Sequence, residues 1–168
     1  MQLTHESALR RLSELHMDDM PVVEIHPTPT QVDTNWFTEY KKLCHQFMKS
    51  LTDSAEELVF LNLSQNEFMA LIMGHAMPQN LSIRFRVPLV WGGKLETDNL
   101  FLCQTFPHSH RLDEFILEQN GANTIWLPNP PKKVYVPIYE TTGGDGGNAT
   151  TDRLSQMAAQ IGKNRSME

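Results

Sequence analysis

A chain of 168 residues with 40% hydrophobic and 20% charged side chains has the size and composition of one globular domain. Its formal net charge of −6 does not favour nucleic acid as a partner, because binding to phosphates depends on a basic surface. No apolar run reaches the roughly 20 residues of a membrane span. The N-terminus also lacks the apolar centre of a secretory signal, so we expect a cytoplasmic protein with Cys44 and Cys103 as buried thiols.

The first half of the chain is predicted to alternate between helix and strand. Thr4 is a candidate helix cap, and Ser64 with Glu67 has the spacing of a capping box. Between them, one helix carries an apolar stripe formed by Trp36, Phe37, Tyr40, Leu43, Cys44, Phe47, Met48 and Leu51. In order we expect a helix over 4–15, a strand over 20–27, a helix from Asp33 or Thr34 to Leu51, a strand over 57–63 and a helix over 65–76.

The second half is predicted to contain more strand than helix. Ile83, Phe85 and Val87 alternate with arginines, which indicates a strand, and Pro88 belongs at an edge or a bulge. We expect strands over 81–91, 99–103, 124–128 and 132–139, and a helix over 110–119. The prediction is an α+β domain over residues 1–140, with one mixed sheet of about five to six short strands and three to four helices.

Residues 141–168 are predicted to form a flexible Gly-rich linker followed by a short tethered helix. The helix would place Leu154, Met157, Ala158 and Ile161 on one side, which makes these four residues candidates for partner binding. We expect that deleting residues 142–168 leaves the domain folded and abolishes capture of a partner.

Candidate chemistry is concentrated near His108 and His110. An H-x-H motif on an extended segment would point both rings to one side, and Asp98 and Asp113 are the nearest carboxylates in the sequence. These four residues are the candidate ligands of a divalent metal. The alternative is that the histidines bind no metal, since two imidazoles alone do not complete a site.

Part of this region, residues 83–110, resembles the core of the HNH-type ββα-metal nucleases. The features that carry the resemblance are, in order, Pro88, Trp91-Gly92-Gly93, Asn99-Leu100, Cys103, and His108 or His110. The resemblance implies that glycines permit the hairpin loop, that Asn99 fixes it by hydrogen bonds, and that His108 and His110 act at a metal ion. Phe85 stands where that family has its general-base histidine, and phenylalanine cannot accept a proton, so we expect the segment to be non-catalytic.

The same segment, followed by residues 120–130, is similar to the HNH-like adaptor subunits of conjugation and type IV secretion coupling complexes. This resemblance implies a non-enzymatic adaptor that binds other protein subunits in DNA transfer, secretion or a mobile genetic element, with no cofactor. One alternative is a divalent-metal-dependent nuclease that uses His108, His110 and Asn99. A second alternative is a small-molecule binding domain whose pocket uses Trp91 or Trp126.

Overall fold

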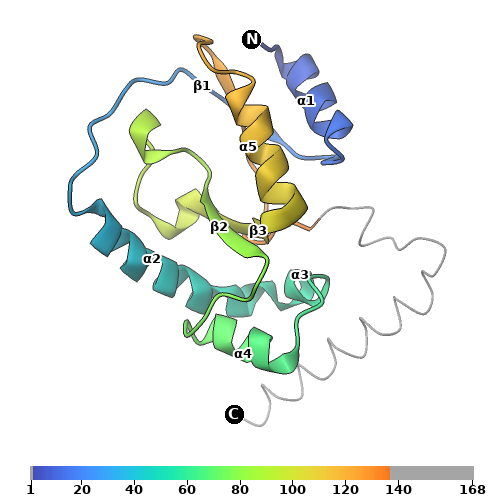
Figure 1. The fold of residues 1–168 in the computed structure, drawn as a ribbon, viewed down its shortest axis with the longest axis vertical. Coiled ribbons are helices and arrows are strands. Elements are labelled where there is room, and N and C mark those ends of the chain that lie inside the picture. Colours follow the sequence, from blue (N-terminus) through green and yellow to red (C-terminus); the bar gives the residue numbers. More distant parts are fainter. Residues whose placement is uncertain (1, 137–168) are drawn as a thin grey trace, which may run out of the picture.

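The computed structural model describes residues 2–136, so the predicted linker and C-terminal helix lie outside the described residues. Within this part of the chain the fold is α+β, as predicted, with four helices of eight or more residues and one helix of five (Figure 1). The helices are α1 (His5–Glu14), α2 (Trp36–Ser50), α3 (Ala55–Val59), α4 (Gln65–Ile72) and α5 (His110–Leu117). The strands are β1 (Val22–Ile25), β2 (Leu81–Phe85), β3 (Leu100–Gln104) and β4 (Ile125–Pro128).

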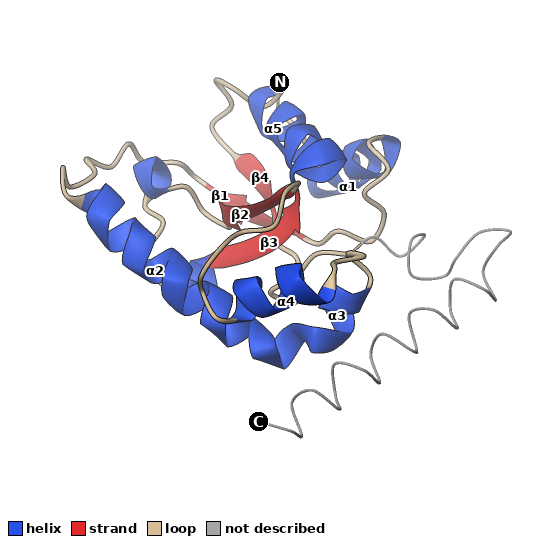
Figure 2. Ribbon diagram, turned by 60° about the horizontal axis from the view of Figure 1, so that its bottom comes forward, coloured by secondary structure: helices blue, strands red, loops and turns tan. Residues whose placement is uncertain are grey.

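The strands form two small antiparallel sheets and not the single mixed sheet of five to six strands that we expected. β1 pairs with β4 with Val23 opposite Leu127, and β2 pairs with β3 with Ile83 opposite Leu102. The last predicted strand is reduced, within the described residues, to one parallel bridge between Leu102 and Val134. The four strands that form have four or five residues each, and Figure 2 shows them in the middle of the molecule, between the helices.

The predicted strand over 57–63 is wrong, because this segment contains the end of α3 and a turn. Its apolar residues are spaced so that Leu58 and Leu61 lie three positions apart and both pack into the same core. A short apolar run cannot be assigned to strand or helix by its pattern alone. The predicted strand over 81–91 is also too long, since β2 ends at Phe85 and residues 89–91 form a helical turn after Pro88.

β3 is buried on both faces, because it lies between two hydrophobic cores. Leu100 and Leu102 point into the first core, and Phe101 and Cys103 point into the second. Successive side chains of a strand point to opposite faces, so this strand reads as a continuous apolar run. Figures 1 and 2 show β2 and β3 with α1 and α5 on one side and α2, α3 and α4 on the other.

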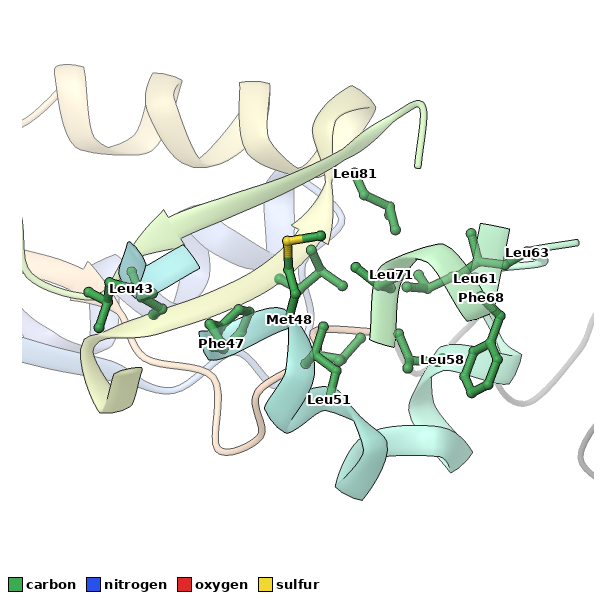
Figure 3. Packing of buried hydrophobic residues seen from close by; sticks show 13 residues of the cluster. Leu43, Phe47, Met48, Leu51, Leu58, Leu61, Leu63, Phe68, Leu71 and Leu81 are labelled. Carbon is green, nitrogen blue, oxygen red and sulfur yellow. The ribbon is translucent and has the colours of Figure 1, made fainter. Parts of the chain in front are cut away.

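The first core fills the space between the β2–β3 pair and helices α2 and α4 (Figure 3). Its buried residues are Leu43, Phe47, Met48, Leu51, Leu58, Leu61, Leu63, Phe68, Leu71, Leu81, Leu100, Leu102 and Val134. The second core lies under α1 and α5 and contains Ala8, Leu12, Leu15, Met17, Met20, Phe101, Cys103, Leu112, Phe115 and Tyr135. The two cores together fix the position of β3 and of the hairpin loop that precedes it.

Both predicted helix caps are present. The Thr4 hydroxyl accepts a hydrogen bond from Ser7 N, and the Ser64 hydroxyl accepts one from Glu67 N, each at 3.1 Å. These bonds satisfy amide hydrogens that have no partner inside a helix. None of the helices in the described residues is both long enough and apolar enough to cross a bilayer.

Candidate functional site

The hairpin loop between β2 and β3 is held by the Asn99 side chain. Asn99 Oδ1 accepts a hydrogen bond from Val87 N, and Asn99 Nδ2 donates to Val87 O and to Lys94 O, all at 2.9 Å. One amide group therefore pairs with both backbone groups of Val87 and closes the loop. All three hydrogen bonds join groups of the hairpin itself.

Two glycines let the loop turn back at its far end. Gly92 has a φ of +91°, a conformation that favours glycine. At Gly93 the limit is space, because a Cβ atom there would lie 1.9 Å from Val87 O. Gly93 N also donates to Pro88 O at 3.0 Å, so the backbone passes too close to its neighbour for any side chain.

The two arginines of the hairpin are bonded inside the molecule. Arg86 donates through Nε to Asp98 O at 3.1 Å, and through its terminal nitrogens to the side chain of Asn129 and to the carbonyls of Pro130 and Lys132. Burial lowers the pKa of Arg86 from its ordinary value, with the charge of Asp98 acting in the opposite direction. Arg86 thus joins the hairpin to residues 129–132.

Arg84, two residues earlier on β2, has a similar role. Its Nη1 donates to Ser109 Oγ and to Asp113 Oδ1, both at 2.8 Å, and to Ser109 O at 3.2 Å. Arg84 therefore joins β2 to the start of α5. Because Arg84 and Arg86 both use their guanidinium groups for internal bonds, the pair does not form an open basic surface for phosphates.

The two candidate histidines do not face the same side. Residues 105–109 form a kinked turn, not the extended segment that we expected: Phe106 alone has an extended backbone there (φ −121°, ψ 130°), and the Phe106–Pro107 bond is cis. His108 is 0% exposed and its ring lies 5.4 Å from the Tyr135 ring. His110 is exposed at the start of α5, with its ring 5.6 Å from that of Phe106.

The environment of His108 disfavours its charged form. Burial, and secondarily the positive charge of Arg111, lower the pKa of His108 to about 4. Its imidazole is therefore neutral at physiological pH. It lies in the interior beside Tyr135 of the second core, away from the side on which His110 meets solvent.

The two candidate carboxylates occupy different elements. Asp98 is exposed in the short helical turn before β3, and Asp113 forms an ion pair with Arg84 on α5. Across residues 2–136, no group of three or more His, Cys, Asp or Glu side chains could hold a metal ion. The structure therefore leaves the four predicted metal ligands divided between the core, the hairpin loop and α5.

Phe85, which the resemblance would align with a general base, is a packing residue. Its ring lies 5.3 Å from that of Tyr40, and it packs against the first core. The two tryptophans named as candidate pocket residues are placed differently. Trp126 donates from Nε1 to Leu3 O at 2.9 Å. Neither Trp126 nor Trp91 is among the residues that line the surface cavities beside Phe60, Met20 and Gly93.

The exposure of Phe37, which belongs to a group of aromatic rings at the start of α2, was missed by sequence reasoning. The apolar stripe predicted that Trp36, Phe37 and Tyr40 would face the core, yet Phe37 is 50% exposed. Ring centroids lie 5.6 Å apart for Trp36 and Phe37, 5.8 Å for Trp36 and Tyr40, and 6.4 Å for Phe37 and Tyr40. The sequence feature that could have indicated this exposure is that the aromatic residues of the stripe begin one or two helical turns before Leu43, the first residue of α2 that is buried in the core.

Comparisons with protein-family models, with curated proteins and with solved structures gave no match. The predicted partner-binding residues Leu154, Met157, Ala158 and Ile161 lie outside the described residues.

Proposed function

We propose that this protein is a non-enzymatic adaptor that binds another protein through an aromatic cluster, defined as Trp36, Phe37 and Tyr40 of α2 together with Phe85 of β2. The single observation that supports this proposal most strongly is the continuity of the four rings, which runs from the exposed Phe37 to the partly buried Phe85. Aromatic side chains are enriched in protein interfaces and dominate their binding energy.

The cluster is held in place before any partner arrives. Tyr40 and Phe85 pack against the first core, and the Lys41 ammonium lies 4.7 Å from the centre of the Phe37 ring. Side chains that are already ordered lose little conformational entropy on binding, so more of the burial energy is retained as affinity. A rigid aromatic surface beside a lysine fits a partner with an apolar pocket and a nearby acidic group.

The nuclease-like segment supports an adaptor more than a nuclease. Phe85 packs, Asn99 closes the hairpin loop, Arg84 binds Asp113, and His108 is buried. Each of these residues has a structural contact that explains its presence. The resemblance to HNH-like adaptor subunits is the reason to propose that the partner belongs to a DNA-transfer or secretion assembly.

The decisive experiment compares two full-length variants for binding to the partner that co-purifies with the tagged protein from its native cells. Phe37→Ala is expected to weaken binding by about 30-fold or more, the loss typical of an interface hot spot. The matched control is Leu117→Ala, which removes another exposed apolar side chain from α5, 71% exposed, and should bind like the wild type. Equal affinity of both variants would refute the role of the cluster.

A nicking assay tests the absence of catalysis independently. Supercoiled plasmid is incubated with the full-length protein and Mg²⁺, Mn²⁺ or Zn²⁺, beside His110→Ala. The adaptor proposal expects no metal-dependent nicking by either protein. Metal-dependent cleavage that disappears in His110→Ala would establish the nuclease alternative in its place.

A further inference from the structure

A second surface feature is an apolar groove of about 310 Å³ that shares no residue with the aromatic cluster. It lies between the turn after α1, the end of α3 and the last described residues. Its apolar lining consists of Phe60, Pro130, Pro131, Val134 and Val136. Val134 is 2% exposed and belongs to the first core, so part of the lining is anchored in the interior.

The rim of this groove is acidic. Asp18 and Asp19 come from the turn after α1, and Glu56 and Glu57 come from α3. Lys132 is the basic residue of the lining, and its Nζ lies 2.8 Å from Glu57 Oε1. Within residues 2–136 the other three carboxylates have no ion pair, although Asp18 accepts a hydrogen bond from the Ser13 hydroxyl at 2.6 Å.

The chain itself supplies a segment with matching chemistry. The described residues end at Val136, which lines the groove, and 32 residues follow it in the sequence. In residues 151–168 three basic side chains flank apolar ones: Arg153, Lys163 and Arg165 stand beside Leu154, Met157, Ala158 and Ile161. The 14 residues 137–150 between them can span at most about 50 Å, which is ample for a return to the groove.

We propose that residues 151–168 bind the apolar groove of the same chain, with its acidic rim. The apolar side chains would cover Phe60 and Val136, which are partly exposed in the groove, and the basic side chains would meet Asp18, Asp19 and Glu56. A tether of this length gives an effective concentration on the order of millimolar, so a weak contact suffices for occupancy. A partner that captures Leu154, Met157, Ala158 and Ile161 must then compete with the groove, which goes beyond the proposed function of the aromatic cluster and does not depend on it.

Zero-length cross-linking of the full-length protein tests the contact directly. A carbodiimide joins a carboxylate to an amine only when the two touch, and Lys163 is the one lysine in residues 137–168. We expect Lys163 to link to Asp18, Asp19 or Glu56 in a mixture of ¹⁴N- and ¹⁵N-labelled protein, always within one isotope. Links between a ¹⁴N chain and a ¹⁵N chain would show that a second copy occupies the groove. Links from Lys163 only to carboxylates outside the groove would show that the segment does not bind there. Either result overturns the proposal.

Trypsin gives a second measurement on the intact chain, because it cleaves after Arg153. Asp19→Asn combined with Glu56→Gln neutralises the rim, and Asn tolerates the φ of +58° at position 19. Losing two charge contacts should speed cleavage after Arg153 by about threefold to tenfold. Glu6→Gln with Glu39→Gln makes the same charge change on exposed carboxylates elsewhere and should leave the rate unchanged; equal rates in both variants would overturn the proposal.

Discussion

The two ends of the segment over residues 83–110 differ in what determines their structure. In the hairpin loop, residue identity determines the backbone path directly, because the Asn99 amide pairs with Val87 and the chain leaves no room for a Cβ at Gly93. At the histidine end the path is determined by packing. His108 is enclosed beside Tyr135, while His110, two residues later, faces solvent.

This difference teaches how far a short motif can be trusted. A motif whose residues bond or restrict their own backbone predicts the same local structure in different proteins, because these hydrogen bonds and steric limits are local. A motif whose residues must converge on a common ion depends on the direction of each side chain, and one helical turn is enough to separate them. The order of residues over 83–110 therefore predicts the hairpin loop better than it predicts a metal site at the two histidines.

The largest effect is expected from Gly93→Ala, which places a methyl group against backbone atoms of Val87 and Pro88. Neither neighbour can rotate away, so the loop must shift, and we expect a loss of about 3 kcal/mol in the free energy of unfolding. Gly92→Ala is the matched control: its Cβ would meet only Thr30 Oγ1 at 3.8 Å, and only the cost of positive φ remains, about 1 kcal/mol. Urea denaturation would contradict the account if both variants lost the same stability.

A smaller loss is expected when Asn99 is replaced by Ala. The variant removes three hydrogen bonds and leaves the backbone groups of Val87 without their partner, which should cost about 2 kcal/mol. Asn80→Gly provides the comparison at the histidine end, since it removes two bonds to the Phe106 backbone and tolerates the φ of +65°. That variant should lose about 1 kcal/mol, because its freed groups reach water; a larger loss than for Asn99→Ala would reverse the comparison.

The third prediction concerns the pH dependence of stability at the histidine end. The pKa of His108 is about 4 in the folded protein and about 6.5 when the chain unfolds, so between these values only the unfolded state takes up the proton. Wild-type stability should therefore fall as the pH drops from 6.5 to 4, and no further contribution from His108 is expected below 4. Above 6.5 the residue is neutral in both states and contributes no slope.

His108→Gln removes this contribution, because glutamine does not titrate. Urea midpoints of the wild type and the variant should be measured at pH 7.5, 5.5 and 4.5. We expect the midpoint of the wild type to fall more steeply than that of the variant as the pH decreases. Parallel curves for the two proteins would mean that His108 is as accessible to protons in the folded state as in the unfolded chain.

Much of the helical structure could be predicted from the sequence, because its signals are local. Thr4 and Ser64 cap helices as expected, and the stripe of α2 fills the first core from Leu43 to Leu51. The strand pattern was less reliable. Residues 57–63 look equally apolar in a strand or a short helix, and nothing in the chain before β2 indicates that β1 would pair with β4, about 100 residues away, in a separate sheet.

The candidate site was predicted in part for the same reason. The role expected for Asn99 came from the resemblance, and its hydrogen bonds all lie within its own loop. The burial of His108 depends instead on Tyr135, a residue whose approach no local pattern indicates. The exposure of Phe37 was missed because periodicity identifies the apolar side of a helix but not where the core beneath it ends. The length of the opposing surface determines that limit, and it is a property of the whole fold.

The placement of β3 between both cores has a consequence for how the molecule unfolds. Leu102 and Phe101 are neighbours in one strand, yet they contribute to the cores on opposite sides of it. Neither half can therefore melt while the other remains intact, because losing one core removes the surface on which β3 is supported for the other. The described chain should behave as one cooperative folding unit. A destabilising substitution in either core should therefore lower the free energy of unfolding of the whole unit.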